Sequence, residues 1–117
     1  MKSIFPKLIR DLPKANIHFD GINAYIQGEC EQIIFMEFEK NVEIPEHSHE
    51  SQWEIVLEGK VRYREDGREY IYKKGDRFFV AKGKKHSATV YAGYSSIVFF
   101  NQPDRYAKKW WTFLFNN

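Results

Sequence analysis

The chain has 117 residues, of which 43% are hydrophobic and 17% aromatic, enough to fill the core of one domain. Its formal net charge is only +2, so neither nucleic acid nor an anionic membrane surface is an expected partner. A single cysteine, Cys30, excludes an intrachain disulfide, and no apolar stretch is long enough to span a membrane. We therefore expect one cytoplasmic domain over residues 1–117.

Most of the chain has the pattern of short strands separated by turn signals. The predicted strands cover residues 22–27, 32–39, 52–58, 60–66, 68–72, 77–81, 86–91 and 95–101. The dipeptide Asp66-Gly67 is typical of a tight hairpin, and glycine turns separate the later strands. Strands at this spacing, without an intervening amphipathic helix, predict an antiparallel sandwich or barrel.

The C-terminal residues have a different pattern. A Pro-Asp pair at 103–104 could begin a helix, and apolar side chains then recur on one helical face at Tyr106, Trp110, Phe113 and Leu114. The stretch "WWTFLF" also has high β-propensity. The sequence thus predicts a short C-terminal helix or strand, whose apolar side must be covered by the barrel or by a partner subunit.

Two of the four histidines, His47 and His49, stand one residue apart. On an extended segment they point to the same side, and Pro45 favours an extended Ile44 before them. Two imidazoles at that spacing form part of a site for zinc, iron, nickel, copper or manganese. The same dipeptide pattern also fits two solvent-facing loop histidines. Another histidine, His18, precedes the first predicted strand and is expected to be structural or exposed.

The surroundings of this pair resemble the first motif of the cupin family. That motif has a glycine, five residues, His-x-His, three or four residues, a glutamate, six residues and a glycine. Here His47 and His49 match the pair, and Gly59 matches the final glycine. Asn41 stands where the first glycine is expected.

The second cupin motif is also recognisable. Gly75 is followed by five residues, by "AKG" at 81–83, by two residues and by His86. Ala81 replaces the proline of the motif, and Val90 replaces its last asparagine. The resemblance runs from Asn41 to about Val90. It implies an all-β double-stranded β-helix, the jelly-roll or cupin barrel, with a core over about residues 22–101.

The resemblance further implies one divalent metal ion held by His47, His49 and His86. The fourth ligand is open, because counting forward from His49 reaches Glu54, whereas counting back from Gly59 reaches Gln52. The turn glycine fixes the strand register while loop length varies, so Gln52 is favoured. Glu54 would then lie beside the metal site, with general base as its candidate catalytic role.

This register gives strand 52–58 two opposite faces. The resemblance implies that Gln52 and Glu54 face the barrel interior and that Trp53, Ile55 and Leu57 face outward, whereas simple patterning would put the three apolar side chains in the core. Because an outward apolar face needs cover, we predict a homodimer that buries Trp53, Ile55 and Leu57. Interior positions are also expected for Met36, Phe38, Tyr63, Phe79, Val98 and Phe100, as cavity lining or as core.

Two functions fit these features. The first is a metal-dependent enzyme of dioxygenase or isomerase type, acting on a small oxygenated molecule. The second is a non-catalytic cupin that binds or senses a small molecule. No helix-turn-helix pattern accompanies the barrel, which disfavours a transcription factor. The basic "KGKK" at 82–85 is either a solvated loop or a rim that attracts an anionic ligand.

Overall fold

The computed structural model describes residues 2–17, 19–28, 32–48 and 51–100. Within them the chain forms a short helix, α1 (Lys7–Arg10), and nine strands: β1 (Ile22–Gln27), β2 (Gln32–Phe38), β3 (Val42–His47), β4 (Gln52–Glu58), β5 (Lys60–Glu65), β6 (Arg68–Lys73), β7 (Arg77–Val80), β8 (His86–Val90) and β9 (Ser95–Phe100). No described helix is long and apolar enough to cross a membrane.

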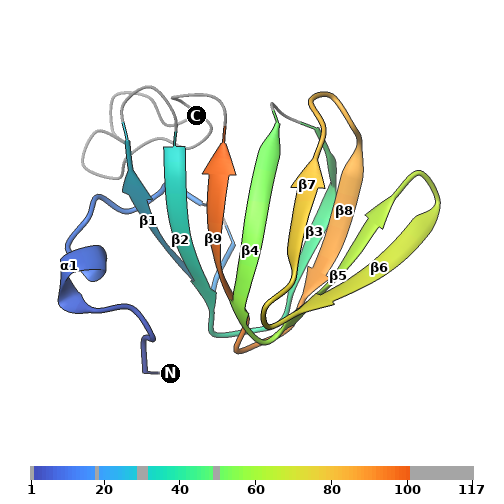
Figure 1. Cartoon of the computed structure of the whole chain (residues 1–117). Helices are drawn as coiled ribbons and strands as arrows, with labels where there is room; N and C mark the ends of the chain where they lie inside the picture. Colours follow the sequence, from blue (N-terminus) through green and yellow to red (C-terminus); the bar gives the residue numbers. More distant parts are fainter. Residues whose placement is uncertain (1, 18, 29–31, 49–50, 101–117) are drawn as a thin grey trace.

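The strands form two antiparallel sheets that face each other (Figure 1). One has the order β1-β2-β9-β4-β7, and the other has the order β3-β8-β5-β6. Neighbouring strands in both sheets come from distant parts of the sequence, as β2 beside β9 and β3 beside β8. The antiparallel sandwich or barrel expected from the strand pattern is therefore confirmed, as is the all-β jelly-roll class that the cupin resemblance implies.

The inner faces of the two sheets enclose the core. Alternation along β4 shows how the sequence selects this face: Glu54 and Val56 are 7% and 1% exposed, whereas Trp53 is 42% exposed. Gln52 lies on the same side as Glu54 and Val56. The interior face predicted for Gln52 and Glu54 is thus the one the fold adopts, and both candidate oxygen ligands lie on it.

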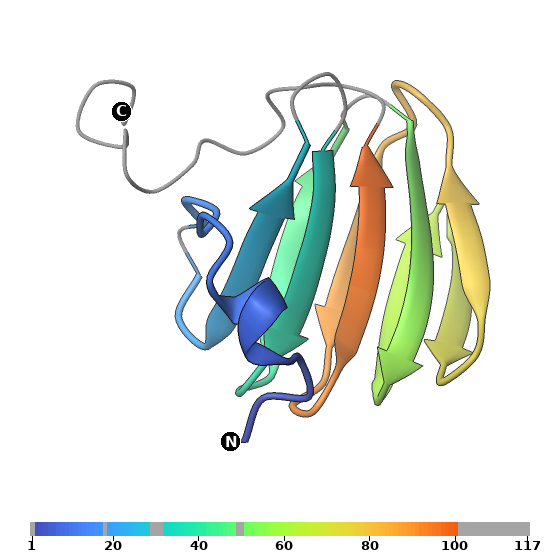
Figure 2. The ribbon, with the colours of Figure 1, turned by 60° about the vertical axis from the view of Figure 1, so that its left-hand side comes forward.

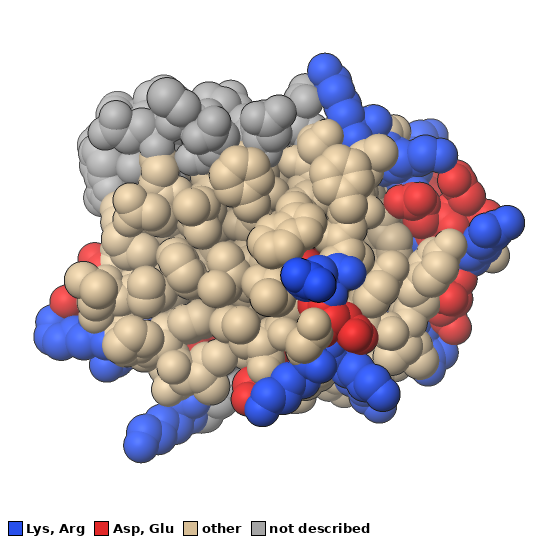
Figure 3. Space-filling model, viewed as in Figure 1, with Lys and Arg blue, Asp and Glu red and all other residues tan. Residues whose placement is uncertain are grey.

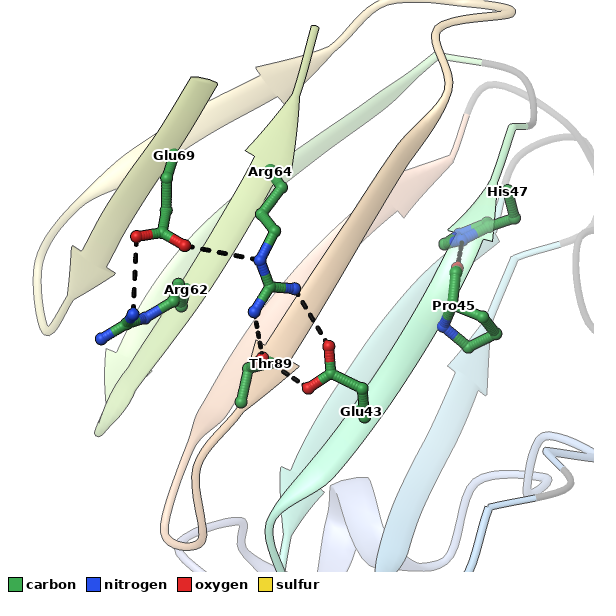
Figure 4. Close-up of polar contacts among 7 residues, drawn as sticks. All are labelled: Glu43, Pro45, His47, Arg62, Arg64, Glu69 and Thr89. Carbon is green, nitrogen blue, oxygen red and sulfur yellow. Dashed lines mark hydrogen bonds and ion pairs between the residues drawn. The ribbon is translucent and has the colours of Figure 1, made fainter. Parts of the chain in front are cut away.

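On the outer face of the four-stranded sheet, charged side chains form contacts between neighbouring strands. The Arg64 guanidinium donates hydrogen bonds to Glu43 on β3 and Thr89 on β8, and pairs with Glu69 on β6 (Figure 4). Arg64, which lies on β5, therefore links all four strands of this sheet. Such a surface is compatible with solvent and needs no apolar cover.

The N-terminal segment covers part of the outer face of the five-stranded sheet. Phe5 packs edge-on against Tyr25 and Phe35, with ring centroids 6.1 and 5.7 Å away. The helix α1 begins directly after Pro6 and lies on the outer side of β1 and β2 (Figure 2). The sequence pattern did not predict this helix, because four residues are too few to show a helical period.

Two further differences concern the connections. The strand β3, which ends at His47, was not among the predicted strands, because Pro45 interrupts its alternation of polar and apolar residues. Asn41, in the position of a motif glycine, accepts a hydrogen bond from the Ala92 backbone N–H through its side-chain oxygen at 2.8 Å. It thus joins two turns. The C-terminal helix or strand expected after residue 101 lies outside the described residues.

Candidate metal centre

A cavity of about 960 Å³ lies between the sheets. Its polar lining includes His47 and His86, which are cross-strand partners in the four-stranded sheet, and Gln52 and Glu54, which lie on β4 in the five-stranded sheet. Much of the remaining lining is apolar, with Phe38, Val61, Val90 and Val98 among its residues. This combination of a few polar groups on an apolar wall is typical of small-molecule sites.

The β3–β8 pairing brings two of the predicted ligands together. His47 ends β3 and His86 begins β8, and the two are direct cross-strand partners. Their ring centroids are 4.3 Å apart. His86 is 5% exposed, whereas His47 is half-buried at the end of its strand. A break in the register between Ile44 and His47 lets His47 meet His86 in this position.

Both imidazoles are held in the same tautomer. Nδ1 of His47 lies 2.9 Å from the Pro45 carbonyl oxygen (Figure 4), and Nδ1 of His86 lies 2.9 Å from the Lys84 carbonyl oxygen. A carbonyl only accepts hydrogen bonds, so Nδ1 carries the proton in each neutral ring. The lone pair is then on Nε2. This is the arrangement by which backbone carbonyls orient histidines that ligate metals.

The third predicted histidine, His49, lies outside the described residues, as do His18 and Cys30. Among residues 2–17, 19–28, 32–48 and 51–100, no group of three acidic, cysteine or histidine side chains could hold a metal ion. His47 and His86 are therefore the described histidines of the expected ligand set.

Gln52 and Glu54 are joined by a hydrogen bond on the inner face of β4. The amide Nε2 of Gln52 donates to Oε1 of Glu54 at 2.7 Å. Because a carboxylate can only accept, this bond fixes which end of the amide faces Glu54. The Gln52 oxygen is then the atom that this side chain can offer to another group.

Tyr94 completes this polar cluster, and sequence reasoning missed it. The buried Tyr94 hydroxyl donates a hydrogen bond to Oε2 of Glu54. Burial raises the pKa of the Glu54 carboxyl, and the hydrogen bonds from Tyr94 and Gln52 oppose this only in part. Burial and the Glu54 charge raise the pKa of Tyr94 well above its ordinary value. Tyr94 therefore keeps its proton and acts as a donor.

The motif glycine Gly59 explains how Tyr94 reaches this position. Gly59 has φ +74°, and a Cβ added there would lie 2.7 Å from Tyr94 Cα. Only a glycine allows the two backbones to approach this closely. No residue pattern of the sequence marked Tyr94, which lies in the turn between β8 and β9.

The other interior predictions have mixed outcomes. Met36, Phe38, Tyr63, Val98 and Phe100 line the cavity, as expected. The prediction for Phe79 is wrong: its side chain is 60% exposed on the outer face, while its neighbours Phe78 and Val80 are buried. The choice of face on a strand of four residues depended on a single alternation.

Comparison with protein-family models decides the family. The cupin domain model matches residues 34–93, about half of the chain. The chain belongs to the cupin family. No curated protein is similar enough to count as a match.

Solved cupin structures share its fold. An RmlC-like cupin from Shewanella frigidimarina is 26% identical, with a TM-score of 0.66, and the match covers 80% of this chain and 86% of that one. KdgF from a Halomonas species is 20% identical, with a TM-score of 0.65 and 78% and 88% covered. Salicylate 1,2-dioxygenase from Pseudoaminobacter salicylatoxidans, solved with gentisate, is 18% identical, with a TM-score of 0.63 and 73% and 26% covered. The last two show the fold alone.

The donor chemistry of this cupin fits a divalent metal ion. The side chains of His47, His86 and Gln52 line the same cavity, and Nδ1 of each histidine is hydrogen-bonded to a backbone carbonyl. Imidazole nitrogen with few oxygen donors suits zinc, iron, nickel, copper or manganese better than calcium or magnesium. With neutral donors alone, the site would leave the charge of such an ion uncompensated.

Proposed function

We propose that this cupin binds one divalent metal ion through His47, His49, His86 and the amide oxygen of Gln52. The bound ion would face the cavity between the sheets and receive a small oxygenated molecule there. The observation that carries this proposal is the shared tautomer of His47 and His86, fixed by two carbonyls at 2.9 Å.

The hydrogen bonds around Glu54 support Gln52 as the oxygen ligand. Both carboxylate oxygens of Glu54 already accept hydrogen bonds, Oε1 from Gln52 and Oε2 from Tyr94. To ligate the ion, Glu54 would have to give up at least part of this buried network. Gln52 can ligate through its oxygen while its nitrogen keeps the bond to Glu54.

The side chains suggest how the protein would contribute to chemistry. A bound ion would supply Lewis-acid polarisation, or redox chemistry if it is iron or copper. Glu54, with its raised pKa, would accept or hold a proton at its carboxylate. Tyr94 would orient that carboxylate, and the apolar wall would exclude water from the ligand. This fits a dioxygenase- or isomerase-type reaction.

One observation favours a second function, a small-molecule-binding cupin without turnover. The cavity wall formed by Phe38, Val61, Val90 and Val98 is apolar, so a ligand could be held there mainly by burial. In this case the metal, if bound, would anchor the ligand rather than activate it. The two functions share the cavity and differ in whether a bound molecule is changed.

Elemental analysis of the full chain, purified without a histidine tag, tests the metal proposal. We expect about one transition-metal ion per chain in the wild type, and at least a tenfold lower content in His86→Ala. His18→Ala serves as the matched histidine control and should keep the wild-type content. Equal metal content in His86→Ala and His18→Ala would reject His86 as a ligand.

The identity of the ion then separates the functional alternatives. Stoichiometric iron or copper would favour oxygen-dependent chemistry, which can be measured as oxygen consumption with small phenolic or enolic acids. Zinc, nickel or manganese would favour isomerisation or hydrolysis. Saturable ligand binding with no product formed by any loaded metal would select the binding function.

A further inference from the structure

The inner face of β8 forms one wall of the cavity over the length of the strand. His86, Ala88 and Val90 all line the cavity, and they alternate with Ser87 and Thr89, which lie on the other face of β8. Four residues of strand span about 13 Å, so the wall extends this far from His86 to Val90. The histidine end of the cavity and its far end are therefore well separated.

The far end of the cavity is apolar in both sheets. Val61 on β5 is the direct partner of Val90, and both side chains line the cavity. Phe38 lies at the same end of the facing sheet, because its backbone is hydrogen-bonded to Gly93 and Tyr94 in the turn after β8. Its ring also lines the cavity. A ligand group in this part of the cavity would be held by burial of its hydrocarbon surface.

The two tyrosines of the cavity wall donate their hydroxyl protons to carboxylates. Tyr63 donates to Glu65 at 2.6 Å, and Tyr94 donates to Glu54. Both protons are thus already used within the protein. The hydroxyl groups of a sugar placed against this wall would lose hydration without gaining these two donors, which is unfavourable. The wall therefore favours hydrocarbon over a polyhydroxylated ligand.

The histidine end of the cavity is open to solvent beside basic side chains. Lys82 and Gly83, in the connection between β7 and β8, are exposed and line the cavity. Basic side chains gather at the upper end of the molecule, over this connection (Figure 3). Among the lining residues that the structure describes, the one carboxyl group is that of Glu54, which accepts two hydrogen bonds. This end of the cavity therefore favours an anionic group.

From this separation of charge and apolar surface we propose that the cavity binds a carboxylic acid with a compact hydrocarbon body, such as an aromatic ring on a short chain. The proposal rests on the metal centre proposed above and adds the chemical class of its ligand. The carboxylate would lie at the histidine end near Lys82, and the hydrocarbon body would lie against Val61 and Val90. Ala88, the small side chain between His86 and Val90, would set the size of the body that fits.

Calorimetric titration of the zinc-loaded full chain with matched acids tests this ligand class. In 3-phenylpropanoate the carboxylate carries an aromatic body, propanoate lacks the ring, and gluconate has hydroxyl groups along its chain. We expect 3-phenylpropanoate to bind at least 100-fold more tightly than either of the other acids, because its ring is buried against the apolar wall. Gluconate binding as tight as that of 3-phenylpropanoate, or no measurable binding of 3-phenylpropanoate, would overturn the proposal.

The uncharged analogue 3-phenylpropanol tests the carboxylate. It has the same hydrocarbon body, and we expect it to bind at least tenfold more weakly than 3-phenylpropanoate, because it lacks the negative charge that the histidine end favours. Equal affinity for the alcohol and the acid would show that the cavity does not recognise an anionic group, and would reject the acid as the ligand class.

Ala88→Met tests where the hydrocarbon body lies. The longer side chain would extend into the cavity, so we expect the variant to fold, to bind 3-phenylpropanoate at least 20-fold more weakly and to bind propanoate like the wild type. Ser87→Met, which adds the same side chain on the other face of β8, is the matched control and should bind both acids like the wild type. If Ala88→Met fails to fold by circular dichroism, Ala88→Val makes the smaller change, with at least a fivefold loss expected. A folded Ala88 variant that binds 3-phenylpropanoate as tightly as Ser87→Met would overturn the proposal.

The zinc content of the same samples separates this proposal from the metal centre. A wild type that holds zinc but does not prefer 3-phenylpropanoate rejects the ligand class alone. A wild type that holds no zinc rejects the metal centre, and titration of that chain still tests the hydrocarbon body. In that case a preference of at least tenfold for 3-phenylpropanoate over propanoate would support the apolar part of the proposal, and equal affinities would overturn it.

Discussion

The Tyr94 hydroxyl donates a hydrogen bond to Oε2 of Glu54, while the Gln52 amide donates to Oε1 of the same carboxylate. Glu54 is thereby held between two donors inside the cavity. This arrangement gives Glu54 and Gln52 separate roles, the first orienting the second. It also makes the tyrosine, which no motif marked, a part of the candidate metal centre.

Replacing Glu54 with glutamine tests this division of roles. The new amide would use its oxygen to accept from Tyr94 and would turn its nitrogen toward Gln52. Gln52 would have to reverse its own amide, presenting nitrogen instead of oxygen to the metal. We expect metal affinity to fall about 10- to 100-fold, as when the partner of a ligand is lost. Competition titration with a chromogenic chelator measures it.

Glu58→Gln is the control for this variant, since Glu58 belongs to the same strand but pairs with Lys74 and is 46% exposed. It should bind metal like the wild type. Metal affinity in Glu54→Gln as high as in Glu58→Gln would show that Glu54 does not orient the ligand.

Tyr94→Phe should lower stability more than it lowers metal affinity. The change leaves Oε2 of a buried carboxylate without its donor, which costs about 1–3 kcal/mol. Urea unfolding of the metal-free chain measures the difference. Tyr91→Phe is the comparison, because the Tyr91 ring lies under Lys60, 5.1 Å from Nζ, and does not line the cavity. Equal stability of the two variants would contradict the role given to Tyr94.

Gly59 and Gly67 have nearly equal backbone conformations, so alanine variants at the two positions distinguish the cost of a steric clash from the cost of backbone strain. Gly59 and Gly67 have φ of +74° and +72°, but only at Gly59 would a Cβ collide with backbone, at Tyr94. Gly67→Ala should lose about 1–2 kcal/mol from its left-handed conformation alone. Gly59→Ala should lose clearly more, as measured by urea midpoints at constant m-value. Equal losses would mean that the close approach to Tyr94 relaxes freely.

The surface network around Arg64 predicts a small dependence of stability on pH. The Thr89 hydroxyl, and secondarily Arg64, hold the pKa of Glu43 below its ordinary value of 4.5. Since the folded pKa is lower than the unfolded one, Glu43 stabilises the fold above the unfolded pKa. The contribution is lost as pH falls through the folded pKa.

Glu43→Gln should therefore lose about 0.2–1 kcal/mol at neutral pH, a small effect because the pair is exposed. The difference from the wild type should vanish in acid. Urea unfolding at several pH values measures it. A difference that stays constant from neutral to acidic pH would mean that charge does not account for the loss.

Much of the fold follows from local patterns. Period-two alternation gave eight strand ranges, and on β4 it separated Glu54 and Val56 from Trp53 correctly once Gly59 fixed the register. Phe79 was placed on the wrong side because a strand of four residues offers one alternation. The short α1 and β3 lack a clear period of their own and depend on tertiary packing.

The candidate site was only partly predictable. Motif spacing predicted that His47 and His86 lie together and that Gln52 and Glu54 face the barrel interior, and the structure places all four side chains in this way. It could not give Tyr94, because the contact with Glu54 joins β4 to the turn before β9, forty positions along the chain. Nor could it give the tautomer of the histidines, which depends on where the Pro45 and Lys84 carbonyls lie.

Titration of the metal-free chain with cobalt(II) tests the central claim most directly, because cobalt reports ligand number through its visible absorption. Histidine ligation predicts saturation at about one ion per chain in the wild type and in His18→Ala, and loss of the cobalt spectrum in His86→Ala. No saturable binding by the folded wild type, or an unchanged spectrum and affinity in His86→Ala, would contradict a metal centre at the β3–β8 pair.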